Sequence, residues 1–121
     1  MNDAGTRGEE IAVTVKELSE KLSLDALCLP EPEREVLGGC AGDLLSWVMS
    51  TAKEGDAWVT IMSNVNVVAV ASLCDVSCVV LAQGVVLEEK ELNTAKEKGI
   101  NILCSSLPAF TLCHGIGEAL K

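Results

Sequence analysis

The residues best suited to bind a ligand lie in a glycine-rich stretch, Gly38-Gly39-Cys40-Ala41-Gly42-Asp43, that follows Arg34. Glycines let a backbone approach a ligand closely, and a turn that opens a helix presents free N–H groups to an anion. A second polar turn, Ser63-Asn64 with Asn66 just beyond it, follows the apolar segment at 57–61. Turns also need glycine, serine and asparagine for purely structural reasons. The candidate ligand-binding set is Arg34, Gly38, Gly39, Asp43, Ser63, Asn64 and Asn66.

No phosphate-binding or catalytic motif accompanies these residues. A Walker-type loop would need Gly-Lys-Ser/Thr, which is absent, and no G-x-G-x-x-G occurs. Asp43 is an acid at the position where a bound phosphate would lie, which argues against phosphate binding. It is predicted to be the N-cap of a helix. Arg34 is flanked by glutamates and either forms an ion pair or reaches a ligand. The sole histidine, His114, is predicted to be structural, and we expect no catalysis and no cofactor.

The six cysteines could indicate a metal site, a disulfide scaffold or apolar filling of the core. No C-x-x-C occurs, and the closest pair, Cys74 and Cys78, is predicted to span a helix end and a strand start. We therefore predict free cysteines in the core and no metal site. Cys40 is a candidate for redox sensitivity, because a thiol at a helix N-terminus has a lowered pKa.

Composition excludes several classes of function. The net charge is −9, and the chain has one Phe, two Trp and no Tyr. Nucleic-acid binding needs a basic groove and often stacking rings, so no nucleic-acid partner is expected. The apolar runs at 65–74 and 78–82 are too short to span a bilayer. We predict a cytoplasmic protein with no membrane contact, a flexible N-terminus at 1–11 and one domain at 12–121.

Hydrophobic periodicity and turn residues predict alternating strands and helices. Thr14 and Glu17 form a capping box, and the 65–75 helix is predicted to be buried on all sides, the 43–52 helix on more than one. The pattern predicts a single α/β domain with a largely parallel sheet of about five strands and helices on both faces. Its expected helices are 15–22, 43–52, 65–75, 88–98 and 107–120, and its expected strands are 26–29, 36–40, 57–61, 77–82 and 100–104.

Several blocks of the sequence resemble the DRTGG domain. They are Arg34-Glu35-Val36-Leu37-Gly38-Gly39, Gly42 to Met49, Trp58 to Ile61, Asn66 to Ala71 and Gly99 to Leu103. The resemblance covers about residues 13–120. The pentapeptide that names the family aligns with 35–39, where only the two glycines remain, and Ser63-Asn64-Val65 replaces a more polar or histidine-bearing turn.

This resemblance implies a fold similar to the N-terminal domain of HPr kinase/phosphorylase, which lacks the catalytic centre. DRTGG domains occur as dimerising or regulatory modules beside CBS domains in pyrophosphatases. Stand-alone versions are associated with iron-only hydrogenases.

Three functions follow as hypotheses. The first is a regulatory domain that forms a homodimer and senses a small-molecule effector such as a nucleotide. The second is a protein-interaction accessory module for a redox enzyme complex of the hydrogenase type, without a small ligand. The third is a cysteine-based redox or iron–sulfur protein. A homodimer is expected in each case, because the predicted apolar helices exceed what one small sheet covers.

Overall fold

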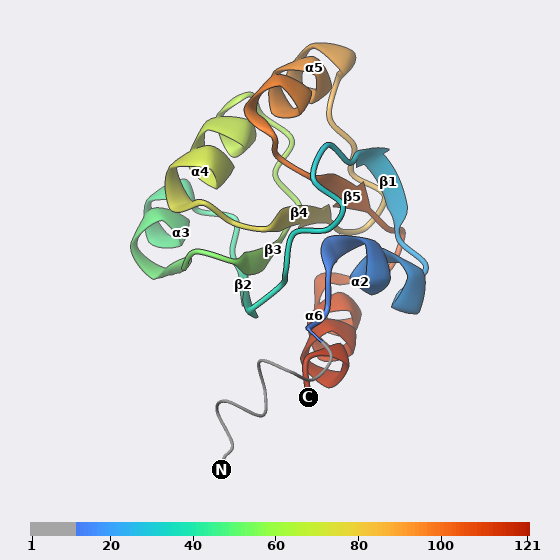
Figure 1. Cartoon of the computed structure of the whole chain (residues 1–121). Helices are drawn as coiled ribbons and strands as arrows, with labels where there is room; N and C mark the ends of the chain where they lie inside the picture. Colours follow the sequence, from blue (N-terminus) through green and yellow to red (C-terminus); the bar gives the residue numbers. More distant parts are fainter. Residues whose placement is uncertain (1–11) are drawn as a thin grey trace.

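Five strands form one sheet in the order β1-β5-β4-β3-β2 (Figure 1). The structure is a computed structural model that describes residues 12–121, so the flexible N-terminus predicted at 1–11 lies outside the described residues. β2 to β5 run parallel, and β1 pairs with β5 in the antiparallel direction. The strands are β1 Asp25–Cys28, β2 Gly38–Ala41, β3 Asp56–Thr60, β4 Cys78–Leu81 and β5 Ile102–Cys104.

Helices cover both faces of this sheet (Figure 1). α3, α4 and α5 lie on one face, and α2 and α6 lie on the other, as the two sets of packed core residues show. The predicted α/β fold, with a largely parallel sheet of five strands, is therefore confirmed. The helices are α2 Val15–Lys21, α3 Leu45–Thr51, α4 Asn66–Cys74, α5 Glu89–Lys98 and α6 Ala109–Ala119.

The central strands are buried on both faces because each face is covered by helices. All five residues of β3 are buried, and they alternate between the two sides. Trp58 packs toward α3, α4 and α5, whereas Ala57 and Val59 pack toward α2 and α6. This arrangement explains how a chain with few aromatic residues builds its core mostly from aliphatic side chains, with Trp58 as its largest fully buried one.

Two of the predicted helix ends, the start of α2 and the end of α5, are present. Thr14 Oγ1 accepts from the Glu17 N–H at 3.1 Å, and Glu17 Oε1 accepts from the Thr14 N–H at 3.0 Å. This reciprocal pair is the capping box of α2. Gly99 ends α5 with a φ of 74°, a left-handed conformation that glycine adopts without strain.

Two predictions about helix burial are wrong. In α3 only Val48 is buried, while Trp47 is 66% exposed and Met49 50% exposed. In α4 the side facing the sheet is buried, but Leu73 is 68% exposed. The physical reason is that each helix packs against the sheet and the adjacent helices on one side only, so apolar side chains on its outer side have nothing to pack against within residues 12–121.

Candidate functional site

The polar turns after β2 and β3 lie side by side at the carboxyl ends of these parallel strands, which we call the carboxyl edge of the sheet. Ser63 and Asn64 follow β3 and precede α4, whose first residue is Asn66. Asn64 Oδ1 accepts from the Asn66 N–H at 2.8 Å and so closes the turn that leads into α4, whose N-cap is Val65. The side chains of Ser63 and Asn66 are exposed and make no hydrogen bond within residues 12–121. They are available to a ligand.

Asp43 also lies at this edge, but the prediction that it is an N-cap is wrong. α3 begins at Leu45, its N-cap is Leu44, and no side chain caps it. Asp43 Oδ1 instead accepts from Thr60 Oγ1 at 2.8 Å and from the Ile61 N–H at 2.9 Å. These bonds tie the end of β2 to the end of β3, and they compete with capping for the same oxygen.

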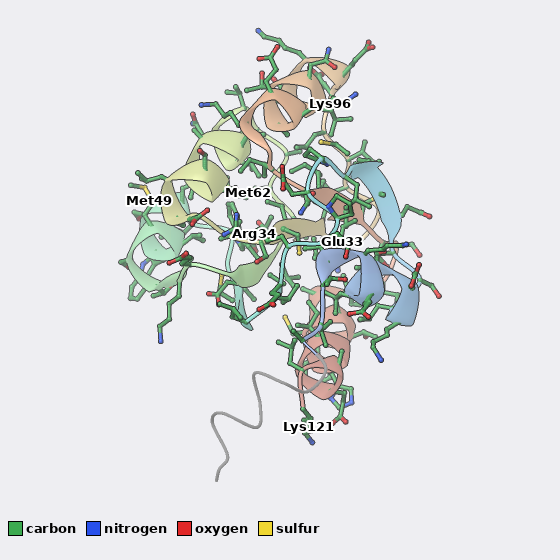
Figure 2. All side chains as sticks on the ribbon, in the orientation of Figure 1. Glu33, Arg34, Met49, Met62, Lys96 and Lys121 are labelled. Atoms are coloured by element: carbon green, nitrogen blue, oxygen red, sulfur yellow. The ribbon has the colours of Figure 1, made fainter. Side chains whose placement is uncertain are left out.

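Arg34, which is labelled in Figure 2, precedes β2 and contacts Asp75, which precedes β4, so it lies at the opposite, amino-terminal end of the sheet. Its Nη2 is 2.9 Å from Asp75 Oδ1 and donates to the Asp75 carbonyl at 2.6 Å. Asp75 follows α4 in a left-handed conformation with a φ of 58°. The ion pair predicted for Arg34 therefore exists, with Asp75 rather than with a neighbouring glutamate, and it joins the segment before β2 to the end of α4.

The strand predicted at 36–40 is present, but it begins at Gly38 and extends to Ala41, so only Gly42 and Asp43 of the glycine-rich stretch form the turn. β2 comprises Gly38, Gly39, Cys40 and Ala41, and it pairs with β3 from Asp56 to Val59. At Gly38 an added Cβ would lie 3.0 Å from Asp56 Oδ1, so a larger residue here would require the Asp56 side chain to shift. The candidate set is thus divided: Asp43, Ser63, Asn64 and Asn66 lie at the carboxyl edge, Arg34 and Gly38 at the amino end, and Gly39 inside the edge strand.

Cys40 does not have the environment of a reactive thiol. It lies in β2 rather than at a helix N-terminus, and burial, with the neighbouring Asp56 carboxylate, raises its pKa to about 12. Burial likewise raises the pKa of Cys78 to about 12. All six cysteines are free, and within residues 12–121 no three His, Cys, Asp or Glu side chains are grouped so as to hold a metal ion.

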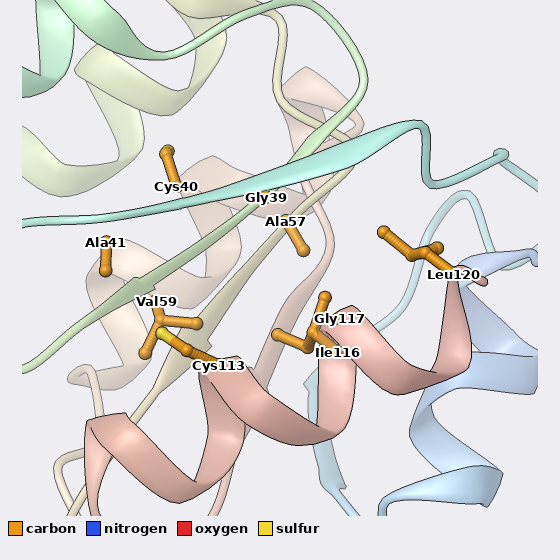
Figure 3. A pocket seen from close by; sticks show the side chains of 9 residues that line it. All are labelled: Gly39, Cys40, Ala41, Ala57, Val59, Cys113, Ile116, Gly117 and Leu120. Atoms are coloured by element: carbon orange, nitrogen blue, oxygen red, sulfur yellow. The ribbon is translucent and has the colours of Figure 1, made fainter.

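Three of the hollows on the surface of residues 12–121 bear on the candidate site. The first is a groove of about 370 Å³ between α3 and α4, called here the α3–α4 groove, formed by Leu45, Met49, Asn66, Ala69, Val70 and Leu73. The second is the α6 pocket of about 270 Å³ between β2 and α6, shown in Figure 3. The third, called here the β2 groove, has about 590 Å³ and follows the outer edge of β2.

Sequence reasoning missed the α6 pocket. Its walls include Val59, Cys113, Ile116, Gly117 and Leu120, most of them contributed by the last helix. A signal was available in Gly117, since a glycine inside a predicted helix lowers helix stability and indicates a packing or functional reason. An added Cβ at Gly117 would meet no heavy atom within 4 Å.

None of the helices in the described part of the chain combines the length and apolar character that crossing a bilayer requires. No protein-family model matches the chain, and no curated protein matches it. Its structure is similar to the crystallised CBS and DRTGG domains from the regulatory region of a Clostridium perfringens pyrophosphatase, in complex with the activator diadenosine tetraphosphate. The TM-score is 0.69 at 16% sequence identity, and the match covers 86% of this chain and 46% of the pyrophosphatase chain. The shared fold agrees with the DRTGG resemblance in the sequence.

Proposed function

We propose that this chain is a non-catalytic regulatory domain that pairs with a second copy of itself through the α3–α4 groove and binds a nucleotide effector at the carboxyl edge of the sheet. The observation that carries the proposal is the uncharged, exposed apolar surface of α3 and α4. The fold of the chain supports the regulatory role, because the similar pyrophosphatase region is regulatory and was solved with a nucleotide activator.

The composition of α3 and α4 favours a second copy as the occupant of the groove. Neither helix contains a charged residue, although 22% of the chain is charged and the net charge is −9. Two copies that met elsewhere would bring like charges together, whereas this surface carries none to repel. Met49 and Leu73 line the groove and remain at least half exposed, as expected for residues that a twofold interface buries.

Asn66 connects this interface to the proposed effector site. It lines the α3–α4 groove and also begins α4 beside Ser63 and Asn64. A nucleotide that contacts Asn66 would therefore lie next to the pairing surface, which is how an effector gains different affinities for two arrangements of a dimer. Asp43, Ser63 and Asn64 complete the proposed site, while Arg34, Gly38 and Gly39 lie outside it.

Sedimentation equilibrium of the Leu73→Asp variant tests the pairing. The unmodified protein is expected to be a dimer at micromolar concentration, and the variant a monomer with an unchanged fold, because Leu73 is 68% exposed. Phe110→Asp is the matched control, since Phe110 is 84% exposed on α6 and lies away from the groove. A monomeric unmodified protein would refute pairing by this surface.

Thermal unfolding with adenine nucleotides, including diadenosine tetraphosphate, tests the effector. A ligand at about a hundred times its Kd adds about 2.7 kcal/mol, which raises Tm by several degrees in a domain of this size. Asn66→Ala is expected to abolish the shift, and Asn93→Ala, an exposed asparagine on α5, to preserve it. A panel with no shift for any nucleotide would refute the effector site.

The accessory-module hypothesis uses the same groove with a different occupant. In that case the unmodified chain would be monomeric and unresponsive to nucleotides, and Leu73→Asp would prevent association with a subunit of a redox enzyme complex. The absence of charge on α3 and α4 favours the second copy.

A further inference from the structure

The two outer strands of the sheet, β1 and β2, are protected to different degrees against pairing with a further strand. Edge strands expose unpaired N–H and C=O groups, and proteins usually protect them with charge, proline or irregular pairing. β1, at one edge, contains Asp25, has an irregular register and is followed by Pro30 and Pro32. β2, at the other edge, reads Gly-Gly-Cys-Ala and has no such residue.

Hollows flank β2 on both sides of its free edge. The α6 pocket and the β2 groove are each lined by Gly39, Cys40 and Ala41, so they lie on either side of a β2 backbone whose outer side has no strand partner within residues 12–121. β2 itself fills neither hollow, because its largest side chain is that of Cys40. Figure 3 shows Cys40 pointing away from α6, and the position of a Cβ on Gly39 would lie 3.6 Å from Ile116 Cγ2 on α6.

The two hollows differ in chemistry. The α6 pocket is walled by aliphatic side chains, including Val59, Ile116 and Leu120. The β2 groove contains the carboxylates of Glu54 and Asp56 against the single ammonium of Lys53. Asp56 is 7% exposed, and its Oδ2 accepts from the Lys53 N–H at 2.9 Å. Its Oδ1 lies 3.0 Å from the position that a Cβ would take on Gly38, and the Cys40 side chain also contacts this carboxylate.

We propose that the free edge of β2 binds an extended segment of a partner protein by strand addition, with apolar side chains entering the α6 pocket and basic side chains facing Asp56 and Glu54. Successive residues of a strand point to opposite faces, so a segment that alternates apolar and basic residues matches both hollows at once. Main-chain hydrogen bonds to β2 supply affinity, and the two hollows supply specificity.

A second copy of β2 is a poor occupant of the same edge. Pairing two Gly-Gly-Cys-Ala strands would leave both hollows unfilled, since no side chain exceeds cysteine. It would also bring the Asp56 and Glu54 carboxylates of both copies toward one shared edge, in a chain whose net charge is already −9. A basic segment from another protein meets neither obstacle.

A synthetic peptide, acetyl-Lys-Ile-Lys-Ile-Lys-amide, tests the proposal on the full chain. Titration monitored by amide chemical shifts should perturb the amides of 38–41 first. Two further peptides are methylated on backbone nitrogens: in the first the lysine nitrogens are methylated, and in the second the isoleucine nitrogens. Only one alternating set of N–H groups can face β2 in strand addition. One methylated peptide should therefore lose at least tenfold in affinity, and the other should bind nearly as well as the parent.

Gly117→Leu fills the α6 pocket from within, because the added side chain enters open space. It also replaces a helix glycine by a better helix former, so the fold should be retained. This variant should lose at least tenfold in peptide affinity, while Thr111→Leu, an exposed residue of α6 outside the pocket, should bind like the unmodified chain. Leu73→Asp should also bind normally, which separates this edge from the α3–α4 groove.

Three outcomes would overturn the proposal. The first is an absence of binding to the parent peptide. The second is equal binding of both methylated peptides, which excludes main-chain pairing with β2. The third is protection of the 38–41 amides from hydrogen exchange in the absence of peptide, if this protection is lost when the protein is diluted. That result would assign the outer side of β2 to a second copy.

Discussion

The two ends of the parallel sheet use the same residue types for different purposes. At the amino end, Asn101, Ser77 and Arg34 all bind backbone carbonyls of other segments. At the carboxyl end, Ser63 and Asn66 are exposed and make no side-chain hydrogen bond within residues 12–121. Residue type alone therefore does not distinguish a structural residue from a candidate ligand-binding one, whereas the hydrogen-bond partners of its side chain do.

The largest expected effect comes from Asn101→Leu at the amino end. Asn101 is fully buried, its Oδ1 accepts from the Glu31 N–H, and its Nδ2 donates to the carbonyls of Glu31 and Ser77. The variant strands buried backbone groups, so the free energy of unfolding should fall by about 3 kcal/mol in urea denaturation. A loss below about 1 kcal/mol would show that the amino end is not held by this residue.

Much of the fold was predictable because local signals agreed with the tertiary structure. The capping box of α2, the glycine after α5 and the aliphatic run of β4 each determine one element without outside help. Element order and sheet type followed from the alternation. Burial of α3 and α4 was not predictable in this way, because apolar residues have the same pattern whether they face a sheet or an exposed groove.

The next largest effect is expected for Asp43→Ala at the carboxyl end. Its carboxylate accepts two hydrogen bonds that join β2 to β3, and a bond to a charged group contributes about 1.5–3 kcal/mol. We expect a loss of about 2 kcal/mol in the same denaturation assay. Asp43→Asn keeps an acceptor oxygen and should lose less. Equal losses for both variants would mean that charge, not geometry, determines this contact.

The site was less predictable than the fold, because the candidate residues were chosen by type. Arg34 and Gly38 have the composition of an anion site, yet Arg34 pairs with Asp75, and Gly38 makes room for Asp56. Both partners are distant in sequence, so only the folded structure reveals them. The α6 pocket is similar, since β2 and the last helix meet only in the folded chain.

A smaller effect is expected for Arg34→Met. Asp75 is more than half exposed, so solvent screens the pair, and its contribution should be less than about 1 kcal/mol. The effect should shrink further when the salt concentration is raised. Asp75→Asn supplies the second arm of a double-mutant cycle, with the unfolding free energy as readout. A coupling above about 2 kcal/mol would mean that the Arg34–Asp75 contact is a principal support of the amino end.

The smallest effect on stability, and the most informative for function, is expected for Ser63→Ala and Asn66→Ala. Neither side chain has a partner within residues 12–121, so each variant should unfold within about 0.5 kcal/mol of the unmodified chain. Asn64→Ala should lose about 1 kcal/mol, because Asn64 Oδ1 accepts a hydrogen bond from the Asn66 N–H at the start of α4.

If a nucleotide binds at this edge, the thermal shift that it produces should disappear in Ser63→Ala and Asn66→Ala while basal stability stays the same. A structural role would give the reverse, with lower basal stability and an intact shift. The contrast between the two ends of the sheet is contradicted if these variants lose as much stability as Asn101→Leu, because Ser63 and Asn66 would then also be part of the frame.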